Sequence, residues 1–354
     1  MNKFDRLRES MKEQGIEGVL LTSMENMQWY SGFSGDTGEI LVTTKKQYFM
    51  TDFRYMEMAE RELGEQFECI KTKQDGLYHE AAELMRQHGI KSLGIETSKV
   101  TLDQKAAMDA AFDVEYISID DKMHELRTIK TPEEIEKMRK GAKITADTFY
   151  HMTKIIKPGI TEFDLLAEML YFFHKSGVKP SFEPIIATGP NSSLPHATIS
   201  NRKVQNGDFV TMDFGVIYGG VCTDFTRTVA VGGVAQELQM IYNIVQKAQI
   251  ATLAVLRPGI TGGEVDAAAR DLITDAGYGA FYEHGTGHGV GVEIHEAPWF
   301  RRGNEQKLQA GMIGTVEPGI YLPGKGGVRI EDMVAITEDG YENFYTVSKD
   351  LIVL

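Results

Sequence analysis

Two segments with nearly the same sequence, Lys157-Pro-Gly-Ile-Thr161 and Arg257-Pro-Gly-Ile-Thr261, occur one hundred residues apart. Each follows a long amphipathic helical pattern, over 133–157 in the first case and about 236–257 in the second. Each also begins a new helix, because threonine is a favourable N-cap residue. These new helices end at Ser176-Gly177 and Ala276-Gly277.

The similarity continues downstream of these helices. Gly207-Asp-Phe-Val-Thr-Met-Asp213-Phe-Gly215 parallels Gly311-Met-Ile-Gly-Thr-Val-Glu317-Pro-Gly319, and the glycines and the acidic residue keep an offset of 104 residues. Two linked blocks in the same order indicate an internal repeat. The sequence therefore predicts two related α/β halves in the later part of the chain, with helices outside and strands facing across a central cleft.

Four acidic residues occupy matching places in these halves. Asp213 and Glu317 lie in apolar strand patterns, and Asp224 and Glu331 follow in the next apolar segments. Buried carboxylates without partners are costly, so such residues need arginines, hydrogen bonds or cations. Four of them converging on one place would repel one another strongly unless divalent metal ions were bound.

Strand alternation decides which of the neighbouring acids Glu331 and Asp332 is the predicted ligand. Arg329 and Glu331 share one face of an extended strand, whereas Asp332 points with Ile330. We therefore predict Glu331 as the ligand, with Arg329 beside it as a supporting positive charge. The alternative is a set of strand-end acids that face water or form ion pairs with Arg227 and Arg329.

The stretch His284-Gly-Thr-Gly-His-Gly-Val-Gly-Val-Glu-Ile-His295 lies between these acids. Its glycines disfavour a helix and predict strand or turn backbone that can approach a ligand closely. In a strand, His284 and His288 can share a face, with His295 further along. Read alone, the stretch is equally consistent with a glycine-rich turn that carries incidental histidines.

An oxygen-rich set of ligands with one histidine suits two Mn²⁺, Co²⁺, Fe²⁺ or Zn²⁺ ions bridged by carboxylates, and suits a Cys/His zinc site less well. The sequence has no HExxH, P-loop, GxSxG or CxxC motif, so the common alternative hydrolase and nucleotide signatures do not compete. His196 follows a turn-rich segment, where a histidine is usually a surface residue.

Composition limits the possible partners and compartment. The chain has 354 residues, 42% hydrophobic and 25% charged, and its net charge of -14 disfavours binding to nucleic acid or an anionic membrane. Cys69 and Cys222, its two cysteines, are far apart, which fits a reducing compartment without disulfides. The sequence has no signal-type or membrane-spanning apolar run, so a cytoplasmic location is expected.

The first part of the chain alternates short strands and helices, which predicts a small α/β domain. The expected strands are 18–22, 39–43, 47–51, 67–71, 92–96 and 114–118, and the expected helices lie near 53–63, 77–88 and 101–112. Asp36 and Arg54 are most simply surface or capping groups. A boundary near Lys130 follows, because Thr131-Pro-Glu-Glu134 is a strong helix start.

With these residues in place, the chain resembles the creatinase/aminopeptidase group of two-domain metallopeptidases, and specifically prolidase (Xaa-Pro dipeptidase) and aminopeptidase P. The resemblance covers nearly the full length. It implies an α/β (α+β) architecture with a small creatinase-like N-terminal domain at 1–125. A pseudo-two-fold pita-bread metallopeptidase domain would then occupy 126–354.

The resemblance also implies a ligand set for two divalent ions, with Mn²⁺ the favoured metal and Co²⁺, Zn²⁺ or Fe²⁺ as alternatives. The five ligand positions of the family appear here in the family's order. Asp224 and Glu331 would bridge the ions, Asp213 would complete one site, and His288 with Glu317 would complete the other.

The same resemblance implies hydrolysis of the bond before proline in a small peptide, by a metal-activated water molecule. Glu317 would accept and return the proton, and His196, His284, His295 and Arg329 would surround the ligands. His295 and His196 would steady the tetrahedral intermediate or the leaving imino group. In relatives the N-terminal domain of a second subunit helps close the site, so a homodimer is expected.

Several alternatives remain at this stage. Aminopeptidase P, which acts on longer Xaa-Pro peptides, is the nearest, and the compact length favours a dipeptidase only slightly. Methionine aminopeptidase shares the ligand set but usually lacks the first domain, and creatinase does not keep these ligands. A non-catalytic binding protein on the same fold is a distant alternative, since such relatives lose one or more ligands.

Overall fold

The chain divides into two compact units in a computed structural model that describes residues 2–73 and 78–354. The first unit ends at Arg127 and the second begins at Thr128. Within the described residues, no helix is both long and apolar enough to cross a membrane. Cys69 and Cys222 are both free thiols.

The first unit is built on one mixed sheet with the strand order β4-β3-β2-β1-β5-β6. β1 pairs antiparallel with β2 and parallel with β5, so the sheet changes direction at its centre. The strands are β1 (Gly18–Leu21), β2 (Glu39–Thr43), β3 (Gln47–Thr51), β4 (Glu68–Lys71), β5 (Ser92–Ile95) and β6 (Glu115–Ser118). All six lie within one residue of the predicted bounds.

Helices surround this sheet. They are α1 (Lys3–Gln14), α2 (Met24–Ser31), α3 (Met56–Leu63), α4 (His79–His88), α5 (Leu102–Ala111) and α6 (Asp120–Thr128), with a short 3₁₀ turn at Gly64–Gln66. The predicted helix 77–88 corresponds to α4, and its first residue lies outside the described part of the chain. α2 and α6 were missed, because eight or nine residues are too few for a clear apolar period.

The second unit contains four long helices and a series of short strands. Its first half comprises α7 (Pro132–Met152), α8 (Glu162–Lys175), β7 (Lys179–Pro180), β8 (Ile185–Thr188), β9 (Phe209–Asp213), β10 (Val216–Tyr218), β11 (Val221–Cys222) and β12 (Thr226–Ala230). Its second half comprises α9 (Gln236–Val255), α10 (Gly262–Asp275), β13 (Gly287–Gly289), β14 (Glu296–Phe300), β15 (Ile313–Val316), β16 (Gly319–Leu322), β17 (Gly326–Arg329), β18 (Asp332–Ile336) and β19 (Tyr341–Asn343). Short 3₁₀ turns lie at Gly189–Ser193 and Gly279–Phe281.

The repeat seen in the sequence is a repeat of structure at the starts of α8 and α10. The side chain of Thr161 accepts a hydrogen bond from the backbone of Asp164, and Thr261 does the same with Glu264. In each case the acidic side chain accepts a hydrogen bond from the threonine backbone amide, which completes a capping box. The two halves therefore begin their second helix in the same way.

The backbone ahead of these helices is also duplicated. The amide of Gly159 donates to the carbonyl of Val204 at 2.8 Å, and the amide of Gly259 donates to that of Leu308 at 2.8 Å. Both glycines have positive φ, 94° and 86°, which a residue with a side chain rarely adopts. Glycine is thus required at the same turn in both halves.

The helices that precede the repeats end earlier than predicted. α7 stops at Met152 instead of residue 157, and α9 stops at Val255 instead of 257. A proline follows each end, at Pro158 and Pro258, and the residue before a proline is disfavoured in helical backbone. Residues 153–155, directly after α7, form a turn.

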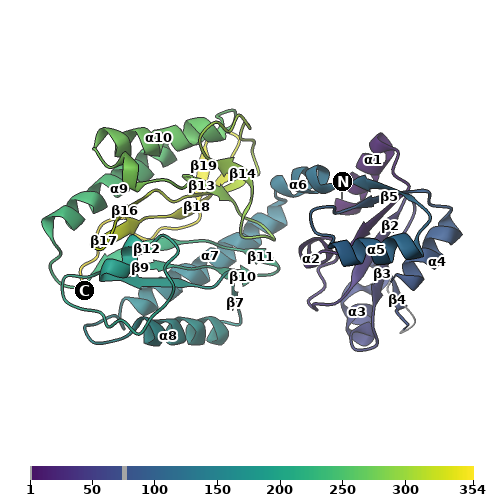
Figure 1. Cartoon of the computed structure of the whole chain (residues 1–354), viewed down its shortest axis with the longest axis horizontal. Helices are drawn as coiled ribbons and strands as arrows, with labels where there is room; N and C mark the ends of the chain where they lie inside the picture. Colours follow the sequence, from purple (N-terminus) through teal and green to yellow (C-terminus); the bar gives the residue numbers. More distant parts are fainter. Residues whose placement is uncertain (1, 74–77) are drawn as a thin grey trace. The chain divides into compact units, whose positions relative to one another are not determined.

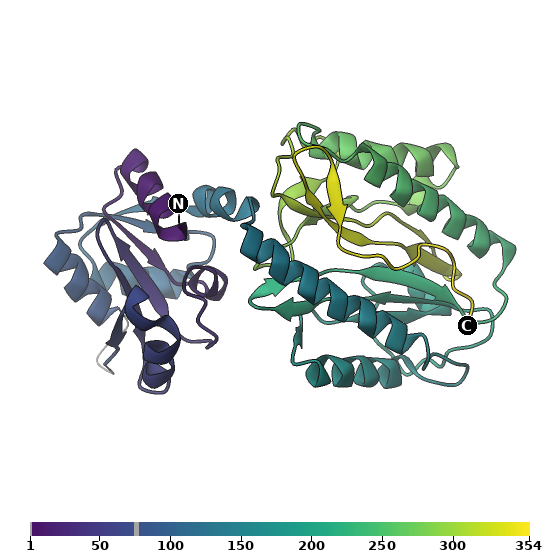
Figure 2. The ribbon, with the colours of Figure 1, turned by 180° about the vertical axis from the view of Figure 1, so that it is seen from behind.

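The four helices lie outside the strands, as predicted. In Figure 2, α7 crosses in front of the strands, α8 lies below them, and α9 and α10 lie above. Met138, Ala142 and Phe149 on α7 are fully buried in one core cluster, and Ile241 and Val245 on α9 are fully buried in another. Strands from both halves therefore occupy the space between two helical layers (Figure 1).

Candidate metal centre

The acids of the two halves lie at matching positions beside the ends of strands. Asp213 ends β9 and Glu317 directly follows β15, while Asp224 lies just before β12 and Glu331 just before β18. The halves meet at one antiparallel bridge, where the Glu331 amide donates to the Thr226 carbonyl at 3.0 Å. This bridge brings carboxylates that are about a hundred residues apart in sequence to one place.

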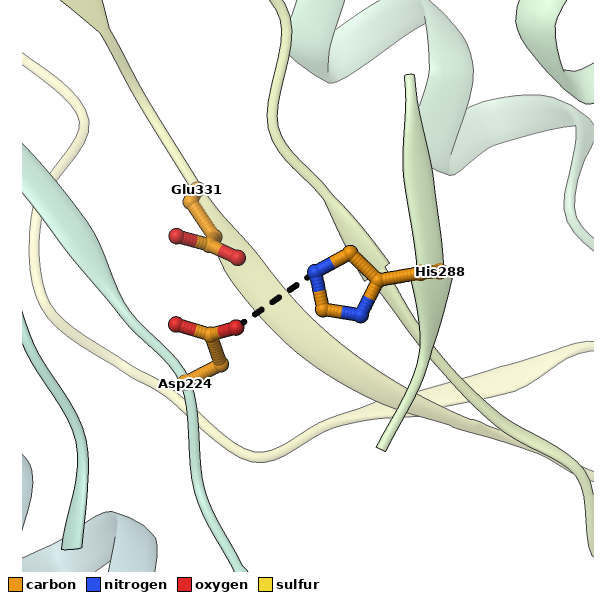
Figure 3. A group of neighbouring side chains, drawn as sticks. All are labelled: Asp224, His288 and Glu331. Atoms are coloured by element: carbon orange, nitrogen blue, oxygen red, sulfur yellow. Dashed lines mark ion pairs between the residues drawn. The ribbon is translucent and has the colours of Figure 1, made fainter. Parts of the chain in front are cut away.

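Three of the predicted ligands form a tight buried group. Oxygen and nitrogen atoms of Asp224, His288 and Glu331 all lie within 4.8 Å of one another. Figure 3 shows the three side chains pointing toward a common centre, with Asp224 Oδ2 3.6 Å from His288 Nε2. Asp224, His288 and Glu331 are 4%, 8% and 1% exposed, so water solvates these polar groups very little.

Glu317 joins this group through His288. Its Oε1 lies 3.2 Å from His288 Nε2 and accepts a hydrogen bond from the Thr315 hydroxyl at 3.1 Å. The same hydroxyl accepts from the backbone amide of His288 at 3.0 Å. The Nδ1 atom of His288 faces the Gly289 carbonyl at 3.0 Å, which leaves Nε2 directed at the carboxylates.

Asp213 lies at the other side of the group, where Arg329 holds it. Arg329 Nη2 donates to Asp213 Oδ2 at 2.5 Å, and its other nitrogens donate to Thr226 Oγ1 and to the Tyr321 hydroxyl. Arg329 was expected beside Glu331, but it reaches Glu331 only through Thr226, whose hydroxyl donates to Glu331 Oε2 at 2.6 Å. The chain leaves the β17 strand after Arg329, so simple alternation does not describe this contact.

Strand alternation nevertheless separates Glu331 from its neighbour. Asp332 lies away from the group, completely buried, and forms an ion pair with Arg227 at 2.6 Å and another with Lys349 at 2.7 Å. Gln249 also donates to its carboxylate. Asp332 is thus neutralised by cations, and Glu331 is the acid that faces Asp224.

The electrostatics of the group are those of crowded buried acids. Burial, reinforced by neighbouring carboxylates, raises the pKa of Asp224 and of Glu331 well above its usual range. Burial also raises the pKa of Asp213, although Arg329 opposes this. For Glu317, burial is outweighed by the hydrogen bond and charge of His288, which lower its pKa to about 2. In turn, the carboxylates overcome the burial of His288 and raise its pKa to about 9.

Two carboxylate oxygens of the group have unmet bonding capacity. Asp213 Oδ1 and Glu331 Oε1 are buried and lack a hydrogen-bond partner among the described residues. Buried acceptors of this kind are rare, and each one needs an explanation. Four carboxylates and an imidazole are the ligand types that Mn²⁺, Co²⁺, Fe²⁺ and Zn²⁺ share, so divalent cations fit this group.

The remaining predicted histidines lie around the ligand group. His284 Nε2 lies 3.0 Å from the Tyr321 hydroxyl, which also accepts from Arg329. The ring of His295 packs edge-on against that of His288, with centroids 4.4 Å apart. His196 is exposed on a turn, and its charge contributes, after burial and His288, to the lowered pKa of His295.

Tyr321 belongs to the site although its sequence context does not indicate it. Its hydroxyl joins His284 to Arg329, and Arg329 in turn holds Asp213. In the sequence Tyr321 is one aromatic residue in an apolar strand, which more often indicates core packing than a polar role. Only the folded arrangement identifies it as part of the site.

Comparisons with known proteins place this centre in a family. The profile of metallopeptidase family M24 matches residues 136–338, and that of the creatinase/prolidase N-terminal domain matches residues 3–129. An Xaa-Pro dipeptidase of Pyrococcus horikoshii is 35% identical over 353 residues, which cover 99% of this chain and 98% of that protein.

Solved structures agree over the whole length. An Xaa-Pro dipeptidase from Bacillus anthracis superposes with a TM-score of 0.95 at 41% identity, covering 99% of both chains. An X-Pro aminopeptidase from Thermotoga maritima superposes with a TM-score of 0.92 at 33% identity, covering all of both chains. The predicted order of a creatinase-like domain followed by a pita-bread domain is confirmed, and the chain belongs to metallopeptidase family M24.

Proposed function

We propose that this protein is a metal-dependent peptidase that cleaves the Xaa-Pro bond of small peptides, acting as an Xaa-Pro dipeptidase. The observation that carries the proposal is the convergence of Asp224, His288 and Glu331, buried and within 4.8 Å of one another. It occurs in a chain that is 41% identical, over nearly its full length, to an Xaa-Pro dipeptidase.

The proposed ligands of two divalent ions are Asp213, Asp224, His288, Glu317 and Glu331. Asp224 and Glu331 are the bridging pair in this proposal, since both belong to the group of three within 4.8 Å and are only 4% and 1% exposed. The orphaned oxygens of Asp213 and Glu331 support the same assignment. We propose Mn²⁺ as the metal, with Co²⁺, Zn²⁺ and Fe²⁺ as alternatives of similar ligand preference.

Bound divalent ions lower the pKa of a coordinated water molecule and polarise the scissile carbonyl. Glu317 is proposed to take the proton from the attacking water and return it to the leaving nitrogen of proline. Its carboxylate is held in place for this step, because its Oε1 lies 3.2 Å from His288 Nε2 and accepts a hydrogen bond from the Thr315 hydroxyl.

The surrounding side chains are proposed to orient the ligands and the substrate. Arg329 fixes Asp213 and, through Tyr321, the ring of His284. His295 and His196 lie on the more exposed side of the centre, where they can donate hydrogen bonds to the oxygen of a tetrahedral intermediate. Removing such a donor usually costs about 10²–10³ in turnover.

The alternative function is that of an aminopeptidase P, which removes the first residue from longer peptides. It is favoured by the X-Pro aminopeptidase at 33% identity over the whole chain. One assay separates the two: release of methionine from Met-Pro and from Met-Pro-Ala by the Mn²⁺-loaded protein. We expect Met-Pro to be cleaved with the higher kcat/KM, and a strong preference for the tripeptide would replace the dipeptidase assignment.

The control for this assay is the same protein treated with a chelator. Activity should disappear on chelation and return when Mn²⁺ is added back. If the fully loaded protein hydrolyses neither peptide, a non-catalytic binding role on this fold becomes the better account.

A homodimer is proposed from the family resemblance alone. Light scattering coupled to size-exclusion chromatography measures the mass directly, against 39.5 kDa for one chain. A mass of twice that value supports the dimer, and the mass of a single chain at micromolar concentration contradicts it.

A further inference from the structure

The segment 290–295, here called the His295 loop, joins β13 to β14 and carries His295 beside the metal centre. It is tied to the first half of the unit, because the amide of Cys222 donates to the Gly291 carbonyl at 2.7 Å. Within the loop, the Gly291 amide donates to the Glu293 carbonyl at 3.0 Å. At its end, Glu296 pairs in register with Gly289 at a β-bulge, directly after His288.

A buried ion pair lies under this loop. Lys130 Nζ is 2.5 Å from Glu296 Oε1, and the two side chains are only 3% and 5% exposed. Lys130 belongs to the segment that opens the second unit, where its amide donates to the Gly311 carbonyl at 2.9 Å. Its ammonium group also donates to the Thr128 carbonyl at 3.4 Å. Lys130 is thus held from two sides before it reaches Glu296.

The His295 loop folds directly over the Glu296 carboxylate. A Cβ atom at Gly291 would lie 2.3 Å from Glu296 Oε1 and 2.7 Å from Oε2, which is closer than any Cβ contact allows. Glycine at 291 therefore lets the loop backbone touch the carboxylate. The position of that carboxylate fixes the path of the loop, and Lys130 fixes the position of the carboxylate.

Burying an ion pair is not in itself a route to stability, because desolvation of both charges offsets their attraction. In some proteins such pairs instead select one geometry among several. Here the ion pair sets the position of Glu296, and His295 is the residue directly before it in the chain.

We propose that Lys130 is a positioning residue, which holds His295 beside the metal centre through Glu296 and the His295 loop. Loss of the Lys130 ammonium would remove the cation 2.5 Å from a carboxylate that is only 5% exposed, and the loop would shift to let water reach that carboxylate. The ligands themselves, on other strands, would keep their places. The kinetic part of the test rests on the proposed peptidase function, but the structural part does not.

The structural test follows the ring of His295 in the full-length, Zn²⁺-loaded protein by NMR with ¹³C-labelled histidine. The chain has nine histidines, and the signal that disappears in His295→Ala identifies the ring. Lys130→Met should shift or broaden this signal, while Lys130→Arg, which keeps the charge, should restore it. An unchanged His295 signal in Lys130→Met would overturn the proposal. Glu296→Gln is the second variant, to be used in the same way if Lys130→Met does not fold.

The kinetic test compares Lys130→Met in two backgrounds. In the otherwise native chain we expect kcat for Met-Pro to fall about tenfold or more, with bound metal and KM little changed. In the His295→Ala background the same substitution should have almost no further effect, because the residue that it positions is gone. Equal loss in both backgrounds would show that Lys130 does not act through His295.

A matched control separates positioning from general loss of stability. Ile241→Ala on α9 removes a fully buried core side chain of the same unit and does not touch the His295 loop. It should lower the melting temperature and leave the His295 signal and kcat at 25 °C unchanged. A protein without Xaa-Pro hydrolysis in the native form would refute the proposed function, and the NMR comparison would still decide the role of Lys130.

Discussion

Glu331 and Asp332 are neighbours in sequence, yet their carboxylates have opposite surroundings. Glu331 faces Asp224 and has an oxygen without a hydrogen-bond partner among the described residues, whereas Asp332 is neutralised by Arg227 and Lys349. Burial raises the pKa of Glu331 well above its usual range. The two cations lower the pKa of Asp332 in spite of its burial. The two acids therefore respond differently to removal of their charge.

Glu331→Gln should weaken metal binding by more than ~100-fold. Loss of a residue that only supports a metal ligand costs about 10–100-fold, and Glu331 is proposed as a ligand itself. It should also make the metal-free protein more stable at pH 8, because one of the mutually repelling carboxylates is gone. Isothermal titration with Mn²⁺ and denaturant unfolding in the presence of a chelator measure the two effects.

Asp332→Asn is the matched control. It leaves Arg227 and Lys349 without their carboxylate, so it should lower the free energy of unfolding by roughly 3–5 kcal/mol while the folded protein still binds metal. If Asp332→Asn removed the metal and Glu331→Gln did not, the assignment of the two acids would be reversed.

The acids and His288 could be found from the sequence, because the repeat places them at matching positions. Thr226, Thr315 and Tyr321 could not, although their hydroxyls fix Glu331, Glu317 and Arg329. Threonine and tyrosine are ordinary strand residues, and nothing in their spacing distinguishes a hydrogen-bonding role from packing.

Among the secondary-structure elements, β2 contains a residue whose charge opposes folding. Glu39 lies at its start, opposite Met50, and burial raises its pKa from an ordinary 4.5 to about 7. A carboxyl group with a raised folded-state pKa costs no stability while it is protonated, below pH 4.5. Stability is then lost as pH rises toward and through 7, because only the unfolded chain ionises easily.

Glu39→Gln should remove that loss. We expect the variant to be more stable than the native chain at pH 8 by about 1–3 kcal/mol. The upper value converts the full pKa difference into free energy, and the lower value allows for the partial exposure of Glu39. Near pH 4 the two proteins should have similar stability. Denaturant unfolding at several pH values measures this, and a constant difference across the range would contradict the assigned cause.

Helix starts were more predictable than helix ends. Thr131, Thr161 and Thr261 were each expected at a helix start, and each forms a capping box. A cap is a local feature of four residues, so the sequence contains it completely. The end of α7 at Met152 depends on tertiary packing and on a proline several residues further on, which a periodic pattern does not register.

At the scale of the whole molecule, every residue proposed for the metal centre lies in the second unit, which begins at Thr128. That unit has its own core clusters around α7 and α9. A fragment of residues 128–354 should therefore fold and bind divalent metal without the first unit. Far-UV circular dichroism and metal titration test this, and a fragment that is unfolded or binds no metal would contradict the division of the chain.

The repeat explains why the overall architecture could be predicted while much of the site could not. Two halves with the same order of elements must place equivalent strand ends close to their common axis, and that follows from the sequence alone. Contacts between the halves, such as Arg329 with Asp213 and Thr226 with Glu331, depend on how the halves join. No pattern within either half contains that information.

The central claim is that the carboxylates of both halves, with His288, form a centre that requires divalent cations. The most direct measurement is the number of Mn²⁺ ions bound per chain, by elemental analysis after equilibrium dialysis, in the native protein and in Asp224→Asn. The account predicts two bound ions in the native chain. It predicts that Asp224→Asn loses the metal while its circular dichroism spectrum stays unchanged. A native chain that binds no Mn²⁺, or an Asp224→Asn variant with the full native content, would contradict it.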